Sequence, residues 1–202
     1  MNIIGRVKYD KIFLTLDTET TTIDGKSFVY LGGFYDGKSC NITRTPYKLA
    51  SALLDYVDTF YQEDRKIICF VHNLSYDMHF LLPYLRSVFG KEEKSIIIDS
   101  HKILAVDFKR IQFRCSYLLT GKSLDTLTTE YNVEHKKLTG TFDYSKVRYQ
   151  DTLLTKKELD YFRHDMIGLY EVLEILIKEK HGLANLPLYS NGVCKEILLI
   201  WK

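Results

Sequence analysis

The sequence lacks the features of a secreted or membrane-spanning protein. Its cysteines are scattered without the paired spacing of a zinc site or a disulfide framework: Cys40, Cys69, Cys115 and Cys194. The first ten residues contain no long apolar stretch typical of a signal peptide, and no segment reaches the roughly 18 apolar residues of a membrane span. We therefore expect a protein of a reducing intracellular compartment. We expect it neither to be secreted nor to bind a membrane.

The sequence also lacks a strong excess of charge of one sign. A formal net charge of +2 allows binding to nucleic acid but does not require it. The 15 Tyr and 11 Phe residues are more informative, because aromatic rings can stack on unpaired bases, although most such rings pack in an ordinary core. With 46% hydrophobic residues, a chain of 202 residues can form one domain with a sizeable core.

The order of apolar segments predicts an α/β domain with a mixed β-sheet flanked by helices. We expect strands over 12–16, 28–35, 39–44 and 66–71, and a hairpin or meander over 96–115. Helical spacing predicts helices over 46–61, 75–89, 123–131 and 155–180, the last with a capping box from Thr155 to Glu158. Residues 1–182 are expected to form the domain, and 183–202 a C-terminal extension or the start of a following element.

Carboxylates follow two of the apolar strands. Asp17 and Glu19 come directly after the first strand, and alternation places both on one face, where they repel each other. A hard cation such as Mg²⁺ or Mn²⁺ would remove that repulsion, although a lone D-x-E is more often a polar turn. Asp77 follows the strand over 66–71 and falls in the first turn of the next helix, where a plain helix-start acid is the alternative.

The long C-terminal helix carries a third acidic position. Tyr161 and Asp165 are separated by four residues and share a helix face. Met166 and Leu169 indicate partly apolar surroundings, in which a carboxylate requires a partner or a metal ion. A phenol beside a metal-held carboxylate can orient an attacking water, whereas Tyr161 taken alone is more often a core residue.

The three patterns D-x-E, N-x-x-x-D and Y-x-x-x-D, in this order, resemble the DEDD exonuclease superfamily, whose fold is RNase H-like. The tyrosine in the last pattern resembles the DEDDy branch. The resemblance implies hydrolysis of phosphodiesters from the 3′ end with two divalent cations, Mg²⁺ or Mn²⁺. It implies that Tyr161 orients the nucleophile and that the cations are held by Asp17, Glu19, Asp77 and Asp165.

The segment FVHNLSYDMHF over 70–80 narrows the resemblance. It is similar to the second exonuclease motif of protein-primed family B DNA polymerases of phages, linear plasmids and adenoviruses, and the similarity extends over about 13–176. In that family the matching residues contact the single-stranded 3′ end or the priming protein. They are Thr20, His72, Asn73, Tyr76, Phe80 and Ser116.

Two positions depart from the family pattern. Thr139 stands where the family often has a lysine that positions the scissile phosphate, and either Lys136 or Lys137 is a candidate to replace it. Cys115 stands where the family commonly has Asp before the serine. Neither departure changes the four predicted metal ligands.

The resulting hypothesis is a 3′→5′ exonuclease acting on single-stranded DNA ends. No polymerase signature follows it, so we expect either the proofreading module of a protein-primed DNA polymerase or a stand-alone relative. A polymerase domain or a priming terminal protein would then be its protein partner. An exoribonuclease of the same fold and a non-catalytic domain that binds nucleic acid or a priming protein remain the alternatives.

Overall fold

A computed structural model describes residues 8–60, 65–99, 102–139, 143, 145–190 and 198–200. The described strands are β1 (Lys8–Ile23), β2 (Lys26–Tyr35), β3 (Cys40–Thr43), β4 (Arg65–Val71), β5 (Lys94–Asp99), β6 (Lys102–Asp107), β7 (Ile111–Cys115) and β8 (Leu198–Ile200). The helices are α1 (Pro46–Phe60), α2 (Leu74–Phe89), α3 (Ser116–Thr120), α4 (Leu124–Glu130) and α5 (Lys156–Glu179), with a 3₁₀ turn, η1 (Leu183–Asn185).

The strands form one mixed sheet in the order β3-β2-β1-β4-β7-β6-β5-β8. At its centre β1, β4 and β7 run parallel, and the outer pairs are antiparallel. A tight turn joins β2 and β3, in which Asp36 Oδ1 accepts hydrogen bonds from the backbone N–H groups of Lys38 and Ser39. Gly37 adopts φ +90° there, a conformation that a residue without Cβ adopts readily.

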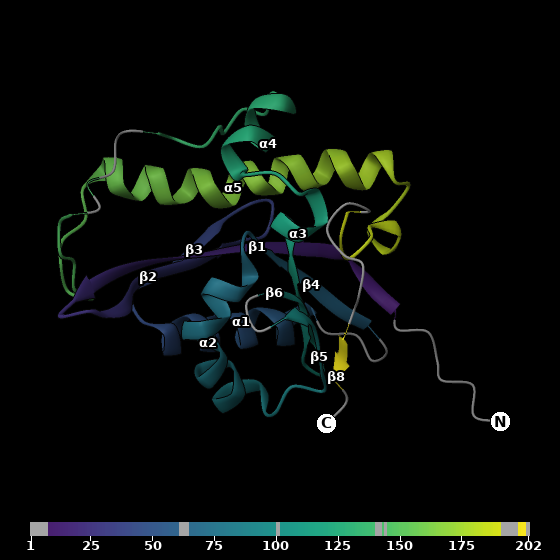
Figure 1. Cartoon of the computed structure of the whole chain (residues 1–202), viewed down its shortest axis with the longest axis horizontal. Helices are drawn as coiled ribbons and strands as arrows, with labels where there is room; N and C mark the ends of the chain where they lie inside the picture. The colour runs from purple at the N-terminus through teal and green to yellow at the C-terminus, as the bar shows by residue number, and fades with distance from the viewer. Residues whose placement is uncertain are drawn as a thin grey trace.

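Helices cover both faces of the sheet (Figure 1), with α1 and α2 on one side and α5 on the other. The alternation of side chains along β1 produces this arrangement. Leu14 and Leu16 belong to the buried cluster that includes residues of α1 and α2, while Phe13 belongs to the cluster that includes Leu169 and Leu173 of α5. The predicted fold class, an α/β domain with a mixed sheet between helices, is confirmed.

The predicted elements agree with the structure in place and type, apart from the length of β1 and three short elements. The strand predicted over 12–16 begins at Lys8, where it pairs with β4, and continues to Ile23, where it pairs with β2. The short helix α3, the 3₁₀ turn η1 and the strand β8, which pairs with β5, were not predicted as separate elements. The capping box that begins α5 is present: Glu158 N–H donates to Thr155 Oγ1, and Thr155 N–H donates to Glu158 Oε2.

Cys40, Cys69 and Cys115 are free thiols, while Cys194 lies outside the described residues. No helix in the described part of the chain is both long and apolar enough to cross a lipid bilayer. The boundary at residue 182 stays a prediction, although Leu183 and Leu186 pack in the same cluster as Phe13.

Candidate active site

The predicted site residues gather where the parallel strands of the sheet end. The β1–β4 ladder ends at the pair Leu16 and Val71, and the β4–β7 ladder ends at Val71 and Cys115. Beyond this line β1 continues with β2 as its partner. The carboxyl edge of parallel strands is where open α/β sheets place their functional groups.

Asp17 and Glu19 lie on the face of β1 that is covered by α5. They continue the alternation of Phe13 and Thr15, and Thr15 Oγ1 donates a hydrogen bond of 2.8 Å to the carbonyl oxygen of Met166 on α5. The prediction that the two acids share a face is confirmed. They lie within β1 rather than after its end, because the strand continues to Ile23.

Asp165 approaches the same two acids from α5. One carboxylate oxygen from each of Asp17, Glu19 and Asp165 lies within 4.8 Å of the others, an arrangement that can hold a metal ion. Asp165 is only 7% exposed, and its Oδ1 is buried without a hydrogen-bond partner among the described residues. Its other oxygen, Oδ2, accepts a hydrogen bond of 2.5 Å from Lys137 Nζ.

Asp77 reaches the site from the opposite helix layer. It lies in the first turn of α2, as predicted, and is 2% exposed. Its Oδ1 accepts a hydrogen bond of 2.6 Å from the hydroxyl of Thr18, which lies between Asp17 and Glu19 on the other face of β1. Asp77 is therefore held beside the group of three acids without belonging to it.

Burial raises the pKa values of the four carboxyl groups, and repulsion from neighbouring acids adds to the rise at Asp17 and Glu19. Burial is the largest cause for each one; it raises the pKa of Glu19 to about 7 and that of Asp77 to about 7. The pKa of Asp17 rises well above its usual range, because of burial first and then repulsion from Asp165. The pKa of Asp165 also rises, although Lys137 opposes the rise. A bound cation would stabilise the charged forms and reverse these shifts.

Tyr161 lies one turn before Asp165 on α5 and is 3% exposed, so its ring is part of the packed interior. The ammonium nitrogen of Lys137 lies 5.1 Å from the centre of this ring. The ammonium group of Lys137 thus lies near both the ring of Tyr161 and the carboxylate of Asp165. Lys136, the other candidate lysine, is exposed, and its backbone carbonyl accepts a hydrogen bond from His164. Thr139 is exposed as well.

Two of the residues predicted to contact nucleic acid form an aromatic pair on α2, in which Tyr76 is exposed and Phe80 is half-buried. The rings of Tyr76 and Phe80 lie 5.3 Å apart, and Tyr76 is 45% exposed. The hydroxyl of Tyr76 lies 2.5 Å from that of Thr20, which links α2 to β1. The structure brings these three residues together, although they do not line the cavity described next.

His72 and Asn73 line a cavity of about 560 Å³ together with Asp17, Lys137 and Asp165. Asn73 has a left-handed backbone conformation, φ 69°, at the start of α2. Burial, and then Lys137, lower the pKa of His72 to about 4.

Ser116 lies behind His72, which lines this cavity. It is fully buried, and its hydroxyl lies 3.0 Å from His72 Nδ1. The structure therefore places it behind His72 rather than at the cavity surface.

Four lining residues of this cavity were not predicted from the sequence: Tyr117, Ser123, Leu124 and Asp125. Tyr117 belongs to α3, Leu124 and Asp125 belong to α4, and Ser123 is the residue that caps α4. Tyr117 is 44% exposed, and its ring lies 5.7 Å from that of His72. The one sequence signal that could have indicated Tyr117 as a site residue is its position directly after Ser116.

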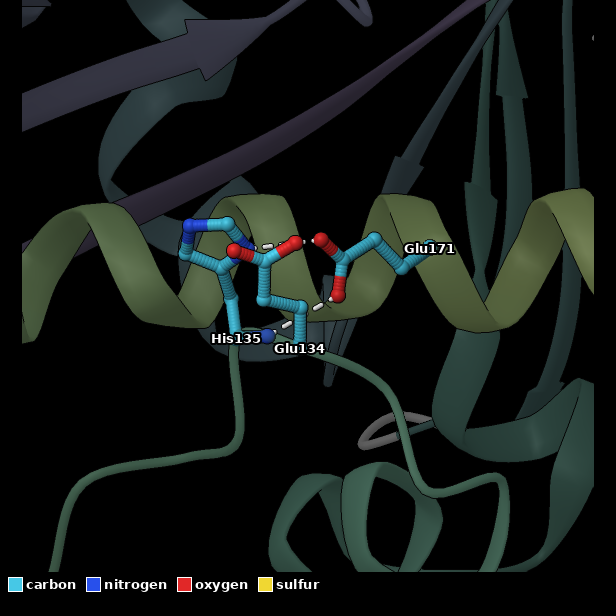
Figure 2. Close-up of side chains that lie close together, drawn as sticks. All are labelled: Glu134, His135 and Glu171. Carbon is cyan, nitrogen blue, oxygen red and sulfur yellow. Dashed lines mark hydrogen bonds and ion pairs between the residues drawn. The ribbon is translucent and has the colours of Figure 1, made fainter.

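A second group with metal-ligand atoms lies on the outer side of α5. Glu134, His135 and Glu171 converge there (Figure 2), with ligand atoms within 4.8 Å of one another. Both oxygens of Glu171 already accept hydrogen bonds from His135, one from its backbone N–H at 3.0 Å and one at its ring Nδ1 at 2.6 Å. These bonds hold His135 and Glu171 together without an ion.

The model of the family described as DNA polymerase type B, organellar and viral, matches residues 58–166, which is more than half of the 202 residues. The chain belongs to this family. This membership confirms the resemblance to family B polymerases. A comparison with curated proteins finds no match.

Solved structures of Phi29 DNA polymerase share this fold. The complex with single-stranded DNA is 18% identical and has a TM-score of 0.65, with 84% of this chain and 32% of that chain covered. The post-translocation binary complex with primer-template DNA is 16% identical and has a TM-score of 0.68, with the same coverage. The orthorhombic crystal form is 17% identical and has a TM-score of 0.67, with 89% and 32% covered. The chain thus spans about a third of the length of these polymerases.

Proposed function

We propose that this protein is a 3′→5′ exonuclease that hydrolyses single-stranded DNA ends. The observation that carries the proposal is the convergence of Asp17, Glu19 and Asp165 from two elements, with Asp77 beside them. Burying four like charges close together costs free energy of folding. A site that binds cations explains why the protein has these charges, whereas a surface that only binds nucleic acid does not require them.

The donor set fits two hard divalent cations, Mg²⁺ or Mn²⁺. It consists of carboxylate oxygens, and the unpartnered Oδ1 of Asp165 offers a coordination position that no protein donor uses among the described residues. Asp17, Glu19 and Asp165 would hold one cation, and Asp17 and Asp77, the latter directly or through water, would hold the other. When bound, the cations would activate a water and stabilise the leaving 3′ oxygen.

Tyr161 and Lys137 would complete the chemistry. The buried ring of Tyr161 leaves its hydroxyl as the group to orient the attacking water beside Asp165. Lys137, rather than Lys136, would take the part of the lysine that the family often has at the position of Thr139. Its ammonium group reaches Asp165, whereas Lys136 is exposed. A fixed positive charge at this place stabilises the negative charge that develops on the phosphate.

The DNA end would enter along the cavity between β1, α4 and α5. Tyr76 and Phe80 would stack on bases, while Thr20 and Asn73 would bind sugar or phosphate, and His72, supported by Ser116, would form the wall of the channel. One Phi29 polymerase structure of the same fold is a complex with single-stranded DNA, which supports this class of partner. A polymerase domain or a priming terminal protein would be the protein partner.

The test is digestion of labelled single-stranded oligomers, DNA beside RNA, with Mg²⁺ or Mn²⁺ or with chelator, and with either the 3′ or the 5′ end blocked. We expect metal-dependent release of nucleotides from an open 3′ end of DNA. The double variant Asp17→Ala/Glu19→Ala should abolish the release. Asp55→Ala, which removes an exposed acid of α1, should not.

Wild-type activity in the double variant would refute the proposal. Faster digestion of RNA would replace it with the exoribonuclease. Calorimetry that shows no cation binding, together with no digestion, would indicate a domain that only binds nucleic acid.

A further inference from the structure

The loop that carries Lys137 is anchored on α5 by specific contacts. The backbone N–H and the ring of His135 both bind the carboxylate of Glu171 (Figure 2), at 3.0 and 2.6 Å. At the next residue, His164 Nδ1 donates a hydrogen bond of 2.9 Å to the carbonyl oxygen of Lys136. The rings of His135 and His164 lie 5.1 Å apart, so the two contacts form one continuous attachment.

The backbone of Lys137 is held from the other side by α4. Its N–H donates a hydrogen bond of 3.1 Å to Oγ1 of Thr128, a fully buried residue. Consecutive residues 135–137 are therefore each fixed by a side chain from a helix. Lysine has a flexible four-carbon stem, so a fixed backbone limits where its ammonium group can lie.

Gly168 makes the close approach of this loop to α5 possible. A Cβ built on Gly168 would lie 2.1 Å from the carbonyl oxygen of His135, a distance that atoms of a folded protein do not adopt. The helix therefore lacks a side chain at the place where the loop crosses it, between His164 and Glu171. Glycine costs about 1 kcal/mol relative to alanine inside a helix, so its presence here has a packing reason.

We propose that Glu171 and His135 are positioning residues that hold the ammonium group of Lys137 on Asp165. Glu171 lies further along α5 than Asp165 and is not among the residues proposed to hold the cations. The role of Lys137 on the phosphate rests on the proposed exonuclease function, whereas its placement by Glu171 does not.

The placement is tested in the metal-free protein by the NMR signal of the Lys137 side-chain ammonium group. The signal is identified by its loss in Lys137→Met. In Glu171→Gln the amide nitrogen cannot accept a hydrogen bond, so one of the two His135 donors loses its acceptor. In the wild type we expect this ammonium signal to be visible because its hydrogen bond to Asp165 protects the protons from exchange with water. Glu171→Gln should lose the signal. Glu174→Gln, the same change at an exposed position of the same helix, should retain it.

A second variant disrupts the contact between the loop that carries Lys137 and α5 through a change in the helix. Gly168→Ala leaves every charge in place and pushes the loop away from α5, so the ammonium signal should be lost here too. Retention of the wild-type signal in either Glu171→Gln or Gly168→Ala overturns the proposal.

The consequence for activity is measured by a double-mutant cycle. Lys137→Met should lower kcat on single-stranded DNA by about 100-fold, as removal of one charge-stabilising group does. Glu171→Gln should lower kcat about tenfold, a size typical of residues that orient a functional group.

Because Glu171 acts through Lys137, the double variant should be no slower than Lys137→Met alone. A double variant slower by the product of both factors would overturn the proposal. If the wild-type protein digests nothing, the proposed function fails, and the ammonium signal still decides the placement.

Discussion

Asp77→Asn should make the metal-free protein more stable at pH 8 than the wild type. Asp77 is 2% exposed, and burial raises its pKa from an ordinary 3.8 to about 7. The folded state therefore binds more protons than the unfolded state between these two pKa values. It follows that the free energy of unfolding contributed by this group is fully present below pH 3.8 and is lost as pH rises to about 7.

The size of the effect follows from the pKa shift. At about 1.4 kcal/mol per pKa unit, the shift from 3.8 to about 7 corresponds to a loss of about 4 kcal/mol of stability across that pH range. Asparagine has nearly the same shape, still accepts the hydrogen bond from Thr18 and carries no charge at any pH. The variant should therefore lack this part of the pH dependence and be about 4 kcal/mol more stable than the wild type at pH 8.

The assay is urea unfolding in chelator, followed by circular dichroism between pH 4 and pH 8. Addition of Mg²⁺ at pH 8 should then raise the stability of the wild type more than that of Asp77→Asn, because the cation neutralises the carboxylate that the variant lacks. Asp55→Asn, an exposed change in α1, serves as the control and should follow the wild type. An Asp77→Asn curve parallel to the wild-type curve in chelator would refute the reasoning.

Three further substitutions give expected outcomes with simple measurements. Tyr161→Phe should slow nucleotide release about 100-fold but leave binding of single-stranded DNA in chelator unchanged, because only the hydroxyl of a packed ring is lost; an equal loss of binding would contradict its role. Tyr30→Phe should leave stability unchanged or raise it by about 1 kcal/mol in urea unfolding, since the Tyr30 hydroxyl is buried without a hydrogen-bond partner among the described residues; a clear destabilisation would count against this. Thr155→Ala should lower the stability by about 1 kcal/mol in the same assay, because the first turn of α5 loses its capping box; a neutral result would show that packing alone fixes this helix end.

The features that the sequence predicted well are local ones. Alternation along β1 is a property of any strand, so the shared face of Asp17 and Glu19 followed from their spacing. The capping box of α5 likewise depends on residues three apart. Asp77 could be assigned to a first helical turn because it follows an apolar strand and a short connection.

The features that the sequence did not predict depend on contacts between distant segments. The full length of β1 is set by its pairing with β2, and β8 exists because it pairs with β5. The part of the cavity wall formed by Tyr117 and Asp125 requires α3 and α4 to fold beside His72. None of these contacts leaves a periodic pattern in the chain.

The sequence by itself determined the order and identity of the four acids, the helices and strands that carry them, and the family. Only the tertiary structure decided that Asp17, Glu19 and Asp165 form one group with Asp77 beside it, and that Lys137 rather than Lys136 reaches Asp165. The physical reason is that desolvation and charge repulsion depend on which groups are close in space and how far water is excluded from them. Spacing along the chain specifies neither.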